Sequence, residues 1–191
     1  MILNLGGGKK QYPDAVNVDI TPERADIVMD LNVFPWGWED NSIDGIHASH
    51  VLEHFADPRP FILECHRILK PGGFLRLVLP HASNVSAVGH LGHYRTFVYS
   101  SMKSHLEAHE SARYYFGRPL FKTVEERINW WYEAGDTEGN INKVLVKVLT
   151  FIDRILTPFI NITPNAPKVF ENFWWVYVGG AKEIVYKGVK I

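Results

Sequence analysis

Three groups of ligand-type residues follow short apolar runs near the start of the chain. The glycine triplet Gly6–Gly8 follows the first run, Asp19 lies at the end of Ala15–Ile20, and Asp30 ends Ala25–Asp30. Glycine permits positive φ angles and a close approach of the backbone to a ligand. A carboxylate at the end of a strand can hydrogen-bond a ribose hydroxyl or an adenine amino group. A lone glycine triplet also fits a plain tight turn, but the three positions together predict a nucleotide-type ligand site.

A second set of candidate residues lies in His50-Val51-Leu52-Glu53-His54, which matches the H-x-x-E-H signature of one class of zinc peptidases. On a helix, His50 and His54 would share a face and bind zinc, with Glu53 as the base. The alternative is a metal-free segment that follows the fourth strand. We expect the second, so no metal is predicted and a zinc hydrolase is the less favoured alternative.

The fifth apolar run is followed by His81, at the edge where open α/β sheets bind ligands. Residues 81–97 are rich in His, Gly and Ser, as expected for a loop or lid. An imidazole with a near-neutral pKa can take the proton of a hydroxyl or amine nucleophile. The alternative is that these side chains only satisfy loop backbone groups. The candidate general bases are His81, His50, His54 and His93.

Short runs rich in Val, Ile and Leu predict the buried parallel strands that must position these residues. The five runs are residues 2–5, 15–20, 25–30, 43–48 and 74–79. Phe61–Leu69 has the spacing of an amphipathic helix, with His66 on its solvated side, and Pro71–Gly73 ends it. This alternation predicts an α/β fold with a Rossmann-like, doubly wound, mostly parallel sheet.

The connection after the glycine triplet is too short for a normal crossover. Ten residues separate Gly8 from Asp19, whereas a parallel crossover usually needs about a dozen or more. The first crossover helix is therefore predicted to be short or missing. A nest of backbone N–H groups would then meet an anionic part of the ligand.

The chain after Pro80 is predicted to form a C-terminal helical elaboration that ends in an antiparallel strand. The expected elements are a helix within residues 98–115, a strand or short helix at 120–131, an amphipathic helix at 144–156 broken by Pro158, and a strand at 183–191. We expect one domain. Its parts are a cofactor-binding core in residues 1–81, an acceptor-binding or lid part in 82–175, and the last strand in 183–191.

Composition excludes several classes of protein. The 191 residues include 20 Lys and Arg against 21 Asp and Glu, and a net charge of −1 argues against a nucleic-acid or membrane-surface binder. A single cysteine, Cys65, excludes an internal disulfide framework. Charged residues interrupt the most apolar stretch, Val144–Ile160, so stable membrane insertion is not expected. No targeting segment is recognisable, and we expect a cytoplasmic location.

With these residues the chain resembles the class I S-adenosylmethionine-dependent methyltransferases, and among them the small type-11 group that includes quinone-biosynthesis enzymes. The resemblance spans roughly residues 1–81, and its last two motifs, following a glycine turn, are highly specific. The motifs are Leu3–Gly8, Asn17–Ile20, Asp30–Asn32, Asp40–Ile46, His50–Phe55 and Glu64–Gly73.

The resemblance implies S-adenosyl-L-methionine as the cofactor and methyl transfer to an oxygen or nitrogen of a small-molecule or glycan-type acceptor. The implied cofactor-binding residues are Asn4, Leu5, Gly6, Gly7 and Gly8 at the methionine end, Asp19 at the ribose, Ile20, Asp30 and Leu31 at the adenine, and Ala48, Ser49 and His50 beside the sulfonium. Trp36 and Trp38 would then lie beside the adenine pocket. Two further pairs, Trp130–Trp131 and Trp174–Trp175, would lie where the acceptor binds.

Two features depart from the pattern of this family. Its glycine fingerprint is longer and alternating, and its first crossover normally contains a helix. These departures keep open an alternative, a non-catalytic binding protein of the same fold with a decayed cofactor site. Asp19 and Asp30 favour the enzyme, because a decayed site has no need for two carboxylates at strand ends.

Overall fold

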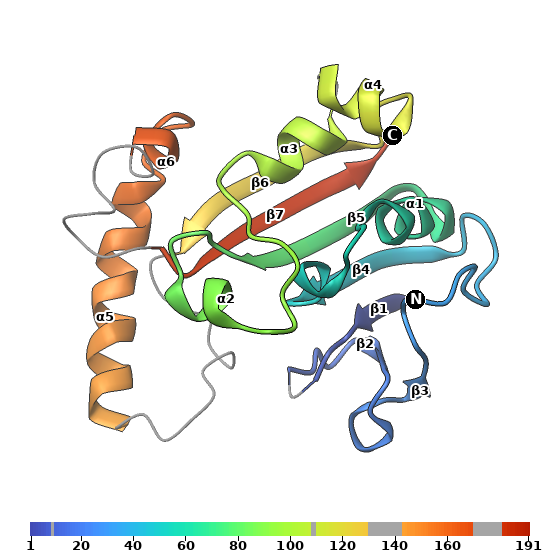
Figure 1. Ribbon diagram of the computed structural model, residues 1–191, viewed down its shortest axis with the longest axis horizontal. Coiled ribbons are helices and arrows are strands. Elements are labelled where there is room, and N and C mark those ends of the chain that lie inside the picture. Colours follow the sequence, from blue (N-terminus) through green and yellow to red (C-terminus); the bar gives the residue numbers. More distant parts are fainter. Residues whose placement is uncertain (9, 108–109, 130–142, 170–180) are drawn as a thin grey trace.

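The computed structural model describes residues 1–8, 10–107, 110–129, 143–169 and 181–191. Seven strands form one sheet in the order β3-β2-β1-β4-β5-β7-β6 (Figure 1). Their bounds are β1 Ile2–Leu5, β2 Ala15–Asp19, β3 Ile27–Val28, β4 Ile43–Ser49, β5 Leu69–Pro80, β6 Phe121–Asn129 and β7 Glu183–Lys190.

The strand directions confirm the predicted fold class. β1 pairs in parallel with β2 and β4, and β4 pairs in parallel with β5. β7 is antiparallel to both of its neighbours, β5 and β6. The chain order reverses between β1 and β4, and this switch point is where open α/β sheets bind ligands. The sheet is therefore Rossmann-like and mostly parallel, with an antiparallel last strand.

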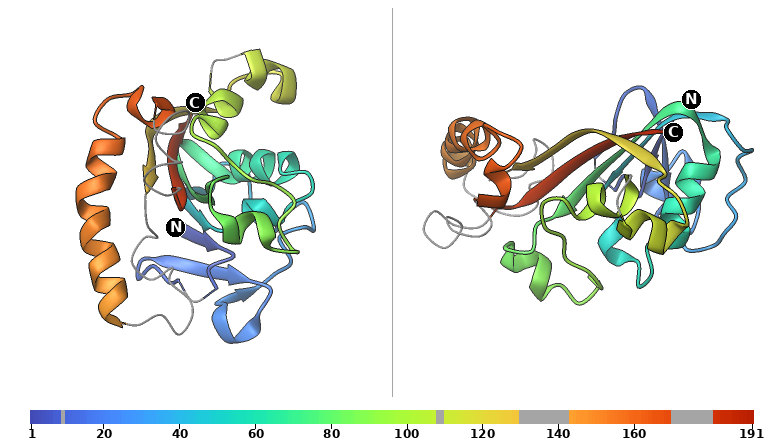
Figure 2. Two further views of the ribbon diagram at one scale, coloured as in Figure 1. Left: turned by 60° about the vertical axis from the view of Figure 1, so that its left-hand side comes forward. Right: turned by 90° about the horizontal axis from the view of Figure 1, so that it is seen from above.

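The helices are distributed unevenly around this sheet. They are α1 Arg59–Ile68, α2 Val85–Gly89, α3 Ser101–Leu106, α4 Glu110–Phe116, α5 Lys143–Ile160 and α6 Ala166–Val169, with 3₁₀ turns η1 Pro22–Arg24 and η2 Leu52–His54. Helices α1 to α4 lie on one face of the sheet, and α5 stands at the end of the strands (Figure 2). The core lies under α1, where Phe61 and Ile68 join Leu3, Ile46 and Leu75 in one buried cluster.

The predicted loss of the first crossover helix is confirmed for the described residues between β1 and β2. A tyrosine of this connection covers part of the sheet face opposite α1. The ring of Tyr12 stacks on His47 of β4, with centroids 4.2 Å apart and planes 16° from parallel. Arg76 of β5 donates to the Tyr12 hydroxyl at 3.3 Å. Aromatic stacking on the strands thus takes the place of a packed helix.

Three local predictions are wrong, and each has a physical reason. The helix predicted within residues 98–115 is two short helices, because Glu107 is extended and ends α3. Pro158 does not break its helix: α5 continues to Ile160, and Asn161 holds this end by hydrogen bonds to Thr157 and to the backbone of Ile128. His66 is not solvated, because it is only 6% exposed.

The strand that follows α1 also starts earlier than predicted. It begins at Leu69, so the segment Pro71–Gly73 lies within β5 and does not separate it from the helix.

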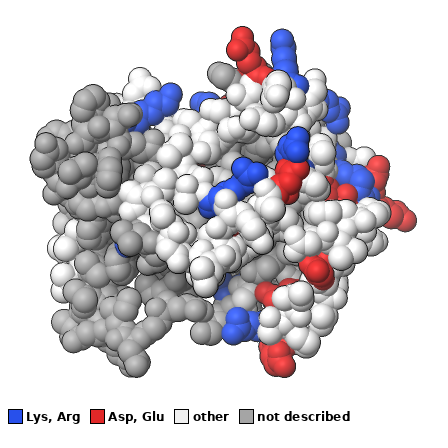
Figure 3. Space-filling model, viewed as in Figure 1, with Lys and Arg blue, Asp and Glu red and all other residues white. Residues whose placement is uncertain are grey.

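The surface carries no dominant charge on the face shown in Figure 3, where basic and acidic side chains are interspersed. This mixture agrees with the net charge of −1. Among the described residues, no helix combines the length and the apolar character needed to cross a bilayer.

Candidate cofactor and acceptor site

The glycine turn after β1 needs all three of its glycines. Gly6 and Gly8 have φ angles of +60° and +53°, in the left-handed region that favours glycine. A Cβ atom on Gly6 would lie 2.6 Å from a methyl carbon of Val51, and one on Gly7 would lie 2.3 Å from Nδ2 of Asn4. The turn is thus fixed by both conformation and space.

The predicted site residues Asn4 and Leu5 lie beneath this turn. The Asn4 side chain is buried, and its Nδ2 donates to the carbonyl of Lys10 at 2.7 Å and to Oδ1 of Asn17 at 2.8 Å. Leu5 is fully buried in the core. The structure therefore places both residues as supports of the turn, and direct contact of either with a ligand stays a prediction.

The carboxylate of Asp19 closes the turn from the end of β2. Its Oδ2 accepts the N–H of Gly8 at 2.9 Å, and its Oδ1 accepts the N–H of Thr21 at 2.9 Å. Burial raises the pKa of Asp19, but the hydrogen bonds from Thr21 and Gly8 outweigh it and hold the pKa below its usual value. Each carboxylate oxygen has a second lone pair, so an ionised Asp19 can still accept a ribose hydroxyl.

Two N–H groups of the turn are already used within the protein. Gly6 donates to the carbonyl of Val18 at 2.7 Å, and Gly8 donates to Asp19. The predicted nest is therefore not formed by these two groups. What the turn offers a ligand is a close approach to the backbone.

The predicted adenine side combines an exposed apolar residue with a carboxylate. Ile20 follows Asp19 and is 65% exposed, which is unusual for an isoleucine and leaves its side chain available to a flat ring. Asp30 accepts hydrogen bonds from the backbone and the side chain of Asn32, and both lower its pKa. Leu31 is buried beside it.

Trp36 does not shield this region as predicted. It is 3% exposed and packs edge-on against Phe61, with ring centroids 5.5 Å apart. Its backbone N–H donates to Oε1 of Glu64 at 2.6 Å, so Trp36 belongs to the core beside α1. Trp38 packs partly buried against the same core. The other two tryptophan pairs lie outside the described residues.

The end of β4 has the features expected beside a ligand. Ala48 is buried, and the hydroxyl oxygen of Ser49 is buried with no hydrogen-bond partner among the described residues. His50, which comes next, has a φ of +54°, in the region that a side chain rarely adopts. Such strain persists only where the surroundings hold it, and it is most common at functional sites.

His50 is held between two fully buried carboxylates. Its Nε2 lies 2.9 Å from Oε1 of Glu183 in β7, and its Nδ1 lies 3.3 Å from Oε1 of Glu53. Burial lowers the pKa of His50, but the hydrogen bond to Glu183 and the nearby charge of Glu53 outweigh it and raise the pKa to about 10. His50 is thus a cation at neutral pH, and this arrangement does not fit its predicted role as a general base.

The H-x-x-E-H motif does not form the predicted zinc peptidase geometry. Residues Leu52–His54 form a single 3₁₀ turn, and His50 lies before it in a left-handed conformation. His50 and His54 therefore do not share the face of an α-helix. The histidine that joins Glu53 and His54 is instead His93, which the segment after β5 brings to them.

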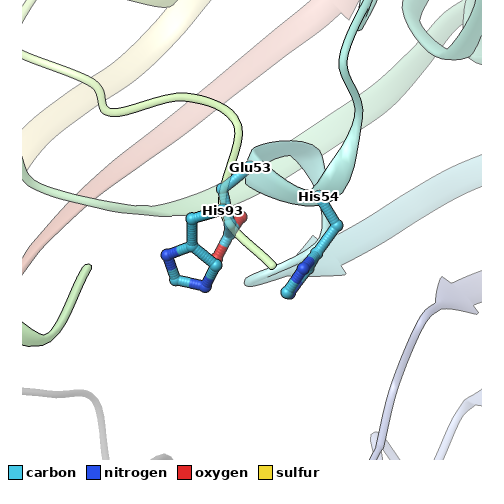
Figure 4. A group of neighbouring side chains, drawn as sticks. All are labelled: Glu53, His54 and His93. Carbon is cyan, nitrogen blue, oxygen red and sulfur yellow. The ribbon is translucent and has the colours of Figure 1, made fainter. Parts of the chain in front are cut away.

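His54 and His93 approach Glu53 from two different segments (Figure 4). The backbone N–H of Tyr94 donates to the carbonyl of Glu53 at 2.8 Å and fixes the two segments together. The ring of His93 stacks on that of His90, with centroids 4.3 Å apart. Burial lowers the pKa of His93, so its imidazole is neutral near pH 7.

The remaining candidate base, His81, is buried with 3% of its surface exposed. Its Nδ1 accepts the backbone N–H of Ser83 at 3.1 Å and lies 2.7 Å from the hydroxyl of the same residue. Because the lone pair of Nδ1 already accepts this hydrogen bond, Nδ1 is not presented to a methyl acceptor. His81 thus lies at the predicted edge of the sheet, but apart from the histidine cluster.

A cavity of about 710 Å³ lies on the helix-covered face, away from the glycine turn. Its walls come from η2, α1, the segment 94–97, α3 and α4. Aromatic and charged side chains line it, among them Tyr94, Tyr114, Tyr115, Arg59, Arg95 and Asp57. This aromatic cavity was not recognisable from the sequence, because its residues are scattered over five segments.

The fold and the site together define a Rossmann-like α/β domain with a glycine turn at the end of β1 and an acidic residue at the end of β2. Residues 9–77 match the type-11 family described as a methyltransferase domain. The match and the shared fold confirm the resemblance to class I S-adenosylmethionine-dependent methyltransferases of the type-11 group, and they indicate S-adenosylmethionine as the cofactor.

Solved structures share the fold over nearly the whole chain. A protein of Bacillus halodurans described as a methyltransferase has a TM-score of 0.57 at 18% identity and covers 99% of this chain and 91% of its own. An S-adenosylmethionine-dependent methyltransferase of Archaeoglobus fulgidus has a TM-score of 0.55 at 15% identity, and the alignment covers 99% of this chain and 85% of that protein. A methyltransferase in complex with the Haloferax volcanii Trm112 activator has a TM-score of 0.51 at 17% identity, and the alignment covers 99% of this chain and 81% of that protein. A search of curated sequences finds no significant match.

Proposed function

We propose that the chain binds S-adenosylmethionine at the carboxyl ends of β1, β2 and β4 and transfers its methyl group to an oxygen or nitrogen of a small-molecule or glycan-type acceptor. The observation that carries the proposal is the closed unit of the glycine turn and Asp19. It combines a backbone that a ligand can approach closely with an ionised carboxylate at the end of β2, where this type of fold is expected to bind a ribose.

The residues present fit this cofactor at each of its parts. The turn Gly6–Gly8 would hold the methionine end, Asp19 the ribose, and the exposed Ile20 the adenine ring. The hydroxyl of Ser49, for which the described part of the chain offers no hydrogen-bond partner, lies at the end of β4, where the sulfonium is expected. When bound, the cofactor supplies an activated methyl group, so the protein needs chiefly to align the acceptor and receive its proton.

The group that activates the acceptor is the cluster of Glu53, His54 and His93. A Cβ on Gly6 would touch Val51, so the segment that carries Glu53 and His54 lies directly against the glycine turn. Without other ligands, His54 or His93 accepts the proton of the nucleophile at Nε2 as the acceptor atom bonds to the methyl carbon and the carbon–sulfur bond breaks. S-adenosylhomocysteine is the second product.

A methyl-transfer screen against a metabolite and glycan library, with S-adenosylhomocysteine formation as the readout, tests this function. We expect turnover with at least one acceptor class and its loss in Asp19→Ala. Cofactor binding without turnover on any acceptor would contradict the enzyme.

That result would favour the second candidate, a non-catalytic binding protein of this fold. The observation that favours it is that the N–H groups of Gly6 and Gly8 already make hydrogen bonds within the protein, which leaves fewer donors to hold the cofactor.

A further inference from the structure

Hydrogen bonds to backbone carbonyls select the same tautomer in the imidazoles of His54 and His93. Nδ1 of His54 lies 2.9 Å from the carbonyl oxygen of Gly92, and Nδ1 of His93 lies 2.9 Å from that of Ala87. A carbonyl only accepts, so Nδ1 carries the proton in both rings, and in the neutral form Nε2 has a free lone pair. Histidines that bind metals are oriented in the same way, with the second nitrogen donating to a carbonyl or carboxylate.

The third member of the cluster, Glu53, is a buried carboxylate that makes no hydrogen bond within the described residues. Its Oε1 lies 3.3 Å from Nδ1 of His50, an imidazole that also pairs with Glu183. One imidazole thus faces two fully buried carboxylates. Because a buried carboxylate is costly unless it is paired or binds a metal, the excess of negative charge points to a further cation beside Glu53.

The geometry brings these three groups within reach of one ion. One ligand atom from each of Glu53, His54 and His93 lies within 4.8 Å of the others (Figure 4). Around a zinc ion with bonds of about 2.0–2.2 Å, such atoms stand roughly 3–4 Å apart. The side chain of His54 is exposed, so a small rotation closes the difference without disturbing the core.

We propose that Glu53, His54 and His93 form a site for a divalent transition metal ion, with Zn²⁺ as the expected occupant. Two imidazoles and one carboxylate are a known catalytic ligand set that leaves a position open. That position would take an oxygen or nitrogen of the acceptor, whose acidity the metal raises. This role in methyl transfer rests on the proposed function, whereas metal binding itself does not.

The test begins with the full chain, freed of metal by a chelator and titrated with Zn²⁺ by calorimetry and with Co²⁺ by visible absorption. We expect about one equivalent of each ion per chain and d–d bands from a coordinated Co²⁺. His54→Ala removes an exposed ligand and is expected to fold normally, yet to weaken Zn²⁺ binding by about tenfold or more. His93→Ala and Glu53→Gln are expected to do the same.

The matched control is His105→Ala, which also removes a histidine whose Nδ1 contacts a backbone carbonyl, that of Ser101. It is expected to leave Zn²⁺ affinity unchanged. Absence of stoichiometric binding to the wild-type chain would overturn the site, and so would equal affinity in His54→Ala.

Titration of the same metal-free chain with S-adenosylhomocysteine separates the two proposals. Binding of the cofactor product without Zn²⁺ binding contradicts the metal site alone. Zn²⁺ binding without cofactor binding contradicts the proposed function alone and leaves the metal site supported.

Discussion

The carboxylate of Asp19 accepts the backbone N–H of Gly8 at 2.9 Å, so the end of β2 and the glycine turn after β1 form one hydrogen-bonded unit. No helix lies among the described residues between β1 and β2, and this hydrogen bond instead fixes the turn on the neighbouring strand. The residue expected at the ribose therefore also shapes the backbone beneath the methionine end.

Gly7→Ala is expected to destabilise the turn through a steric conflict with Asn4. A Cβ there would lie 2.3 Å from Nδ2 of Asn4, and overpacking of this kind typically costs about 1–3 kcal/mol. Urea unfolding of Gly7→Ala, Asn4→Ala and the double variant measures the conflict. We expect strong non-additivity, because Asn4→Ala removes the atom that clashes. Simple addition of the two losses would contradict this account.

Ile20→Ser separates cofactor binding from folding. The side chain is 65% exposed, so the free energy of unfolding is expected to change by less than about 0.5 kcal/mol. Loss of an apolar contact with adenine is expected to weaken S-adenosylhomocysteine binding by about tenfold. Calorimetry gives the affinity, and Val124→Ser, also exposed but in β6, serves as the control. Unchanged affinity in Ile20→Ser would remove Ile20 from the site.

Tyr12→Ala is expected to loosen the connection between β1 and β2. It removes the stacking on His47 and the hydrogen bond from Arg76, which together are worth about 1–2 kcal/mol. Tyr12→Phe keeps the ring and is expected to retain most of the stability in urea unfolding. Equal losses in the two variants would show that the ring stacking contributes nothing.

A buried histidine is expected to make the fold sensitive to acid. Burial, together with Lys190 and Arg118, lowers the pKa of His66 from 6.5 to about 4. Below pH 6.5 the unfolded chain takes up a proton that the folded chain refuses, so stability falls as the pH drops from 6.5 towards 4. The expected loss is on the order of 3 kcal/mol.

Unfolding free energies of the wild type and His66→Phe between pH 7 and pH 4 measure this contribution by difference. Phe removes the titrating group but keeps a ring against Phe121, which His66 meets edge-on at 5.6 Å. The variant is expected to lose less stability on acidification. A parallel loss in both proteins would show that His66 does not titrate in this range.

The sheet was predictable from the sequence because its signals are local. Each strand is a short apolar run, and the ten residues between Gly8 and Asp19 already exclude a normal crossover helix. The continuation of α5 past Pro158 was not predictable, because the end of this helix is held by hydrogen bonds between the Asn161 side chain and the backbone of Ile128 in β6. Contacts of this kind leave no local pattern.

The candidate site was predictable in its residues but not in their pairing. The H-x-x-E-H motif brought together His50 and His54, whereas the fold turns His50 towards Glu183 and gives His54 the neighbour His93. Glu183 had no signal at all, since only the antiparallel pairing of β7 with β5 brings it to this edge. The solvated position predicted for His66 was wrong because β6 and β7 cover that side of α1.

Calorimetric titration with S-adenosylhomocysteine, carried out on the wild type, Asp19→Ala and Asp26→Ala, tests whether Asp19 and the glycine turn bind the cofactor. Asp26 is the matched control, since it also accepts a backbone N–H, that of Asn17 at 2.8 Å, but lies away from the expected ribose. We predict binding by the wild type, a loss of about tenfold or more in Asp19→Ala, and an affinity within about threefold of wild type in Asp26→Ala. No binding by the wild type, or undiminished binding by Asp19→Ala, would contradict the account.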